Sequence, residues 1–104
     1  MPKFENSCNV VHCDKKLSKS ELIRAIRFNI AAEYEAIQLY QQVVESTDNE
    51  FVKTVLTDIA NEEKEHAGEL LKVLTELDKE ESEFYKKGAK EVEELKKENN
   101  IKES

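Results

Sequence analysis

The chain almost entirely lacks the residues that let a backbone turn sharply. Its 104 residues include only two glycines and one proline. A β-sandwich or β-barrel needs many tight turns, which Gly and Pro usually form, so all-β folds are nearly excluded. A phosphate-binding domain built on a glycine-rich loop is excluded for the same reason. Charged residues make up 38% of the chain, with Glu and Lys prominent, and this composition favours long helices in a single domain.

The overall charge narrows the class of partner. The net charge is −7 and the pI is about 4.9, whereas nucleic-acid binding depends on basic patches. No apolar run approaches the ~20 residues that a membrane span requires, and no signal peptide is recognised. We therefore expect a cytoplasmic protein with no nucleic-acid and no membrane partner. The richness in Lys and Glu would suit a thermophile.

Two apolar stripes predict two long helices. The first helix follows a capping box formed by Ser18 and Glu21 and runs from about Lys19 to Glu45, and the second runs from about Glu50 to Leu77. Apolar residues recur every three or four positions in both: Leu22, Ile26, Ile30, Ile37, Tyr40 and Val44 in the first, and Val52, Val55, Ile59, Leu70, Val73 and Leu77 in the second. Because the break at residues 46–49 is short, the two helices must pack antiparallel as a hairpin.

The segment after the hairpin predicts a third, weaker helix. It is expected from about Glu81 to Lys97, and Gly88 weakens it by roughly 1 kcal/mol relative to Ala. Residues 18–97 are accordingly interpreted as the helical domain and residues 98–104 as a C-terminal tail.

The first segment, residues 1–17, shows no helical period and is interpreted as an N-terminal arm. It contains Cys8, His12 and Cys13 in the pattern Cys-x-x-x-His-Cys. These are either ordinary residues of a tail or the members of a disulfide or a shared metal site. A four-ligand zinc motif needs a second ligand pair, which the sequence lacks.

Three ionisable residues interrupt the two apolar stripes. Glu33 occupies the gap in the first stripe, and Glu63 and His66 occupy the gap in the second. With the turn centred near Asp48, Glu33 lies 15 residues before it and Glu63 lies 15 residues after it, so both sit about 22 Å from the turn. In an antiparallel pair they lie side by side, with His66 one turn further along. Because burying an unpaired carboxylate costs several kcal/mol, something must compensate at this level.

This set matches half of a di-iron carboxylate site. In helical bundles such a site takes one Glu from each of two helices and a Glu-x-x-His from each of two others. One hairpin supplies Glu33 together with Glu63 and His66, so a two-fold homodimer would supply the full set and bury the open seams. The alternative is chance, because Glu-x-x-His arises on many charged helices. Tyr40, on the face of Glu33, is either a core aromatic or a neighbour of the metal.

Two stretches resemble the encapsulated ferritins, which are ferritin-like proteins housed inside encapsulin nanocompartments. They are the runs Glu33-Tyr34-Glu35-Ala36-Ile37-Gln38-Leu39-Tyr40-Gln41-Gln42 and Asn61-Glu62-Glu63-Lys64-Glu65-His66-Ala67, within a resemblance over roughly Leu22 to Leu77. The fold implied is all-α. It is an antiparallel two-helix hairpin, half of a ferritin-like four-helix bundle, with a short C-terminal helix and with the bundle completed by dimerisation. Ordinary ferritins and rubrerythrins carry both halves in one chain.

The resemblance also implies an activity and roles for single residues. The protein would be a ferroxidase that oxidises Fe²⁺ to Fe³⁺ with dioxygen at a di-iron centre between subunits. Glu33 would be the terminal carboxylate ligand, Glu63 the bridging carboxylate and His66 the nitrogen ligand. Tyr40 would lie beside the centre, and Glu35 would form part of an entry site for iron.

Partners and location follow from the same resemblance. Family members assemble five dimers into a ring-shaped decamer, and the encapsulin shell takes the iron that they oxidise. The implied location is therefore the inside of a cytoplasmic encapsulin nanocompartment. Two departures stand out, because Ala32 replaces a second acid and residues 99–104 lack the family's Gly/Leu-rich peptide for docking to the shell. Related archaeal forms look like fusions to the shell protein, which leaves open that this chain is a domain of such a fusion.

Two other functions remain open at this point. One is a rubrerythrin-like di-iron peroxidase, although rubrerythrins usually add an iron site with paired Cys-x-x-Cys motifs, which Cys8 and Cys13 do not provide. The other is a metal-free helical dimerisation module. Iron content separates them, because a di-iron centre needs about one iron per chain and the module needs none.

Overall fold

The computed structural model describes residues 16–102, so Cys8, His12 and Cys13 lie outside the described residues. Within residues 16–102 all regular structure is helical, as predicted. The helices are α1 (Lys19–Ser46), α2 (Glu50–Leu77) and α3 (Lys79–Glu98). None of the helices in this range combines the length and the apolar character that crossing a membrane requires.

Side chains at the helix starts fix where α1 and α2 begin. The Ser18 hydroxyl accepts a hydrogen bond from the Glu21 backbone N–H at 3.1 Å, and the Glu21 carboxylate accepts one from the Ser18 N–H at 2.8 Å. This is the predicted capping box, which satisfies two backbone donors at once. At the start of α2, Asn49 Oδ1 accepts from the Val52 N–H at 3.1 Å. The connection between the helices is thereby held to three residues.

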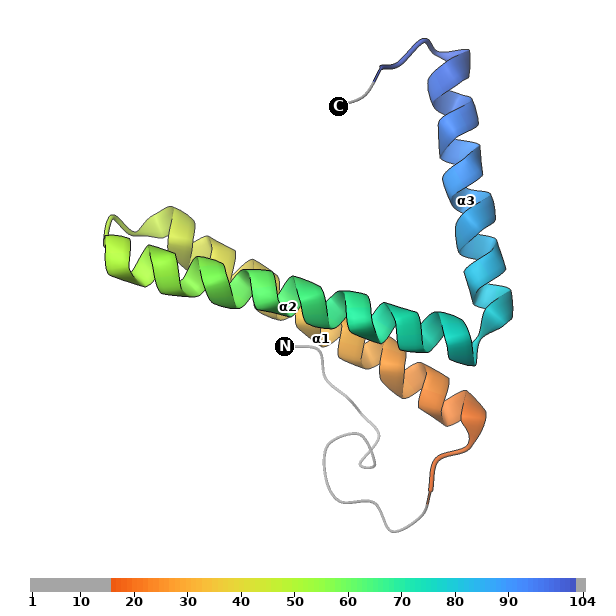
Figure 1. The fold of residues 1–104 in the computed structure, drawn as a ribbon, viewed down its shortest axis with the longest axis horizontal. Helices are drawn as coiled ribbons and strands as arrows, with labels where there is room; N and C mark the ends of the chain where they lie inside the picture. The colour runs from red at the N-terminus through yellow and green to blue at the C-terminus, as the bar shows by residue number, and fades with distance from the viewer. Residues whose placement is uncertain (1–15, 103–104) are drawn as a thin grey trace.

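The two long helices pack side by side and antiparallel, confirming the predicted hairpin (Figure 1). The buried residues along their contact are Ile30 and Ile37 of α1 and Ala60, Ala67 and Leu74 of α2. Alanine at two of the three α2 positions lets the helix axes come close. No other residue in the described range is a buried apolar one, so a single hairpin has a thin core and leaves much of its apolar surface open.

Helix α3 departs steeply from the end of the hairpin and does not fold back along it (Figure 1). It begins two residues earlier than the sequence predicted, because Asp78 caps it by accepting a hydrogen bond from the Glu81 N–H at 3.0 Å. None of its residues is buried. The helix continues through Gly88, whose open surroundings impose no packing demand on that position.

Candidate metal centre

The hairpin brings together the three residues that interrupt its apolar stripes. Glu33 lies near the middle of α1, and Glu63 and His66 lie one turn apart near the middle of α2. One ligand atom from each residue lies within 4.8 Å of the other two. Nδ1 of His66 is 3.7 Å from Oε2 of Glu33 and 3.9 Å from Oε2 of Glu63. Glu33 and Glu63 are equally far from the turn, and the 3.6-residue period places His66 on the same face as Glu63, so the three side chains come together.

The two carboxylates are withdrawn from solvent while the imidazole is open. The side chains of Glu33 and Glu63 are 23% and 21% exposed, whereas that of His66 is 51% exposed. Oε2 of Glu33 is buried and accepts no hydrogen bond. A buried acceptor without a hydrogen-bond partner lowers the stability of the folded state, so this oxygen destabilises the hairpin.

The electrostatics of Glu33 reflect this crowding. The pKa of Glu33 is raised, first because its carboxyl can share a proton with that of Glu63, and next because burial disfavours the charged form. The charge of Glu63 acts in the same direction, whereas His66 lowers the pKa. Two acids therefore face each other where water cannot easily satisfy both, and a bound cation would relieve the repulsion and give the buried oxygen a partner.

The donor set restricts the ions that fit. Two carboxylates with one imidazole suit divalent first-row metals such as iron. Three ligand atoms leave positions open for a second source of ligands or for a small reactant. The group is half of the four-Glu, two-His arrangement that helical bundles use for two iron ions.

Two further predicted residues lie outside this meeting point. Tyr40 is half-buried on α1, seven residues and hence two turns beyond Glu33, on the same side of the helix. Glu35 is half-buried as well, but two residues from Glu33 its side chain starts about 200° around the helix. Neither belongs to the group of ligand atoms within 4.8 Å, so a role for either one remains a prediction.

The outer side of α2 adds negative charge near the site. Glu62 is fully exposed, and its pKa is raised first by a hydrogen bond to the Asp58 side chain and then by the charge of Asp58. Glu65 adds to the effect, while His66 opposes it. Acidic side chains at this position attract cations from solution.

Sequence reasoning missed a second polar cluster, on another side of the hairpin. Arg27 of α1 pairs with Asp78 in the connection to α3 and with Glu81 in the first turn of α3. No local sequence pattern predicts the pairing of Arg27 with Glu81, which are 54 residues apart. The one local signal is the position of Arg27 between the apolar residues Ile26 and Phe28, and it does not indicate which residue Arg27 contacts.

Comparisons with known proteins agree with the fold. A model of the family named Rubrerythrin matches residues 25–104. Among solved structures, the encapsulated ferritin domain from Pyrococcus furiosus superposes with a TM-score of 0.80 at 38% sequence identity. The match covers 89% of this chain and 95% of that one.

Two curated relatives are similar over part of the chain. A ferritin-like–encapsulin shell fusion protein of Pyrococcus furiosus is 41% identical over 65 residues, which are 62% of this chain and 19% of that protein. The encapsulin nanocompartment cargo protein EncC of Myxococcus xanthus is 47% identical over 53 residues, 51% of this chain and 41% of that one. The matched region thus spans less than half the length of either curated relative.

Proposed function

The chain belongs to the rubrerythrin family and to the encapsulated ferritins, and on that premise we propose that it is a ferroxidase. It would take Fe²⁺ as substrate and oxidise it to Fe³⁺ with dioxygen at a di-iron centre. The observation that carries the proposal is the convergence of Glu33, Glu63 and His66 around one point of the hairpin. The buried and unpaired oxygen of Glu33 is the second support, because a cation would satisfy it.

Each ligand has a separate task in this proposal. Glu63, in the Glu-x-x-His pair, would bridge two iron ions, Glu33 would bind one ion from the neighbouring helix, and His66 would supply a nitrogen ligand. Two ferrous ions would each lose one electron, and one dioxygen would accept both electrons together with two protons and leave as hydrogen peroxide. Carboxylates stabilise the ferric product because they carry the negative charge that a trivalent ion prefers. Tyr40 would lie beside the centre, and Glu35 would act on the entry of iron.

The centre would be shared by two copies of the chain. One hairpin supplies two carboxylates and one imidazole, and a two-fold partner would double this set. The face of α2 around His66 also exposes apolar side chains to solvent. Val55 and Val73 lie three turns before and two turns after it on that side of α2, and they are 41% and 44% exposed. A second hairpin laid on this face would bury both valines and complete the metal ligands.

The location of the protein is part of the proposal. The names of two relatives tie them to encapsulin, one as a cargo protein and one as a fusion to the shell. We propose that this chain likewise works inside a cytoplasmic encapsulin nanocompartment, as a ring-shaped decamer of five dimers, either fused to the shell protein or docked to it. Co-expression with an encapsulin shell, followed by size-exclusion chromatography and electron microscopy, tests this. Elution of all of the chain apart from intact shells would contradict it.

A kinetic experiment tests the ferroxidase. Anaerobic protein is loaded with Fe²⁺ and mixed with oxygenated buffer, and the formation of Fe³⁺ is followed by absorbance. We expect Glu63→Gln to slow oxidation by more than about tenfold, because a carboxylate that bridges two ions binds both. Glu69→Gln is the matched control, since it removes an exposed acid from the same helix, and it should retain the wild-type rate. Oxidation by Glu63→Gln at the wild-type rate would contradict the assignment.

The family match favours one rival reaction, reduction of hydrogen peroxide at the same centre, as in a rubrerythrin-like peroxidase. The oxidant decides between the two. Reduced protein is mixed with dioxygen in one experiment and with an equal concentration of hydrogen peroxide in the other. Faster oxidation by dioxygen supports the ferroxidase, and much faster oxidation by peroxide supports the peroxidase. Failure to bind iron at all would leave the metal-free dimerisation module.

A further inference from the structure

Helix α3 has few contacts that could determine its direction. It has no buried residue, and its apolar side chains, Phe84, Tyr85, Val92 and Leu95, are 47–61% exposed. It is joined to α2 by a single residue, Asp78, which lies in neither helix. Rotation about the backbone of one residue is enough to swing a helix through a wide range of angles. Asp78 bonds to Leu74 of α2 and to Glu81 of α3, and a contact from outside this short connection is needed to restrain the angle further (Figure 1).

Four side chains from three parts of the chain meet at this corner. Arg27 reaches out from α1, and its Nε donates a hydrogen bond to Oε1 of Glu81 at 3.2 Å, while its Nη2 donates to the same oxygen. Nη2 also lies 3.6 Å from Oδ2 of Asp78. The other oxygen of Glu81, Oε2, accepts a hydrogen bond from the hydroxyl of Tyr85. We call Arg27, Asp78, Glu81 and Tyr85 the clasp.

The clasp satisfies Glu81 more completely than an ordinary surface pair would. The Glu81 side chain is only 14% exposed, and both of its oxygens accept hydrogen bonds. The pKa of Glu81 is lowered, first by its hydrogen bond with Arg27 and then by that with Tyr85. Because Arg27 holds one oxygen and Tyr85 holds the other, the orientation of the Glu81 carboxylate is fixed as well as its distance from Arg27.

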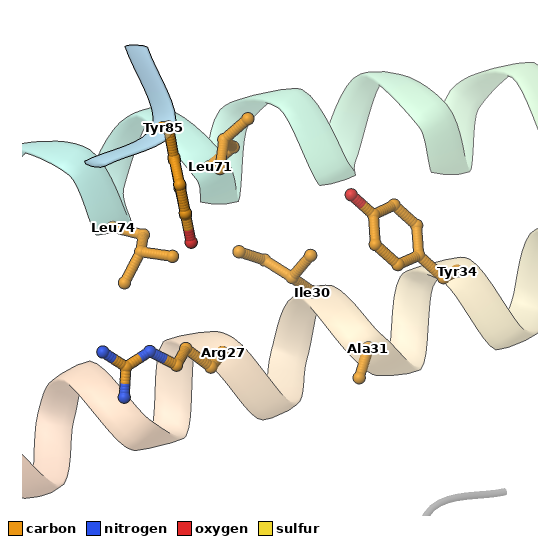
Figure 2. A pocket seen from close by; sticks show the side chains of 7 residues that line it. All are labelled: Arg27, Ile30, Ala31, Tyr34, Leu71, Leu74 and Tyr85. Atoms are coloured by element: carbon orange, nitrogen blue, oxygen red, sulfur yellow. The ribbon is translucent and has the colours of Figure 1, made fainter. Parts of the chain in front are cut away.

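The clasp also anchors an aromatic ring against the hairpin. Figure 2 shows Tyr85 extending from α3 toward α1, between Leu71 and Leu74. The ring forms one wall of an open pocket of about 370 Å³, to which Ile30 and Tyr34 of α1 also contribute. Since Tyr85 is 47% exposed, this contact alone buries little apolar area. The hydroxyl of Tyr85 is held by Glu81, so the clasp helps to keep the ring in this position.

We propose that Arg27 is the residue that sets the angle between α3 and the hairpin. It contacts the connection and the first turn of α3 from the opposite helix, so it crosses the corner that Asp78 alone would leave free to rotate. Removing the guanidinium takes away the contacts between α1 and α3 at Glu81 and frees the helix to swing about Asp78. The inference does not depend on the metal centre, because Arg27 and Glu33 are six residues apart and point about 120° away from each other around α1.

Distances between spin labels measure the angle directly. Cys8 and Cys13 are changed to serine in the full chain, and labels are attached at Thr57→Cys on α2 and Glu94→Cys on α3, both at exposed positions. Labelled protein is diluted with unlabelled protein so that only distances within one chain are observed, and pulsed electron resonance gives the distribution. The parent should give one narrow distribution. In Arg27→Ala we expect the width to increase at least twofold.

Arg24→Ala is the matched control. Arg24 lies one turn earlier on α1, and its guanidinium donates to Ser20 Oγ at 2.7 Å within the same helix. Its loss should leave the distribution narrow. A distribution in Arg27→Ala that superimposes on those of the parent and Arg24→Ala would overturn the proposal, as would a broad distribution in the parent.

A second variant covers the case in which Arg27→Ala fails to fold. Glu81→Gln acts from α3, outside the hairpin, and it removes the charge while keeping an oxygen for Tyr85. It should broaden the distribution in the same way while the helical circular dichroism is unchanged. A narrow distribution in Glu81→Gln would overturn the role of the ion pair. Melting temperature alone would not serve here, because any lost contact can lower it.

Discussion

Replacing Glu33 by glutamine should stabilise the metal-free protein while it destroys the metal centre. Glu33 Oε2 is buried without a hydrogen bond and faces the Glu63 carboxylate. An unsatisfied buried acceptor costs about 1–3 kcal/mol, and Glu33→Gln removes the charge and introduces an amide donor that can bond to Glu63. We expect the free energy of unfolding to rise by about 1 kcal/mol at neutral pH, which corresponds to roughly 4–8 °C in Tm for a domain of this size.

Urea unfolding in the presence of a chelator, followed by helical circular dichroism, measures the change. The gain should shrink as the pH is lowered. The raised pKa of Glu33 means that the folded protein binds this proton more tightly than the unfolded chain does, so the wild type loses stability as the pH rises through the ordinary glutamate range toward the raised value. Below the ordinary pKa of glutamate, about 4.3, wild-type Glu33 is itself neutral and the advantage of glutamine disappears.

The ranking should reverse when Fe²⁺ is added without oxygen. A metal that binds only the folded protein stabilises it by RT ln(1 + [L]/Kd), and Glu33→Gln forfeits most of this gain. Glu45→Gln, at an exposed position of α1, controls for the general effect of removing an acid. If Glu33→Gln proves less stable than wild type without metal while Glu45→Gln is unchanged, the argument that Glu33 is held in an unfavourable site is refuted.

Three other outcomes are expected. Fe²⁺ should shift the sedimentation of the protein from small species toward dimers or rings, because it cancels the repulsion among the shared carboxylates. The shift should vanish in Glu63→Ala/His66→Ala. Equal mass distributions with and without metal would contradict this coupling of metal binding to assembly. Glu35→Ala should change the rate of iron uptake or oxidation in stopped-flow experiments and leave the amount of bound iron unchanged, whereas loss of that iron would show that Glu35 is a ligand. Since the pKa of Glu81 is lowered, the clasp should stabilise the fold above the ordinary glutamate pKa, and this stability should be lost as the pH falls through the lowered value. The free energy of unfolding of Glu81→Gln in urea should therefore approach that of wild type in acid. A difference between the two proteins that does not change with pH would refute this.

The hairpin and the meeting of its polar residues could be predicted because both follow from local rules. The capping box at Ser18 and the short break before Glu50 set the helix ends, and the period of 3.6 residues then determines which side chains face inward. Once the turn is located, an antiparallel register needs no further information, so Glu33 and Glu63 had to lie at the same level.

The direction of α3 could not be predicted in this way. It depends on the backbone angles of Asp78, near φ −127° and ψ 87°, and on an ion pair between Arg27 and Glu81 that are 54 residues apart. Neither the backbone angles nor the ion pair can be predicted from a periodic pattern in the sequence. The structure starts α3 two residues before the predicted Glu81 because Asp78 caps it, and no periodic pattern in the sequence marks Asp78 as a cap. The burial of one particular oxygen of Glu33 was likewise beyond reach, since it depends on the rotamers of three side chains.

The length of α3 turns small changes at its base into large ones at its far end. Its 20 residues form a lever of about 30 Å that pivots at Asp78. A rotation of about 10° at the pivot carries the last turn sideways by about 5 Å, which is about half of the 8–10 Å that separates the axes of packed helices. A displacement of that size breaks the side-chain contacts at the tip, because such contacts require heavy atoms within about 4.0–4.5 Å of each other. Any surface that the tip shares with another molecule therefore demands a precision of a few degrees at a corner made of four side chains.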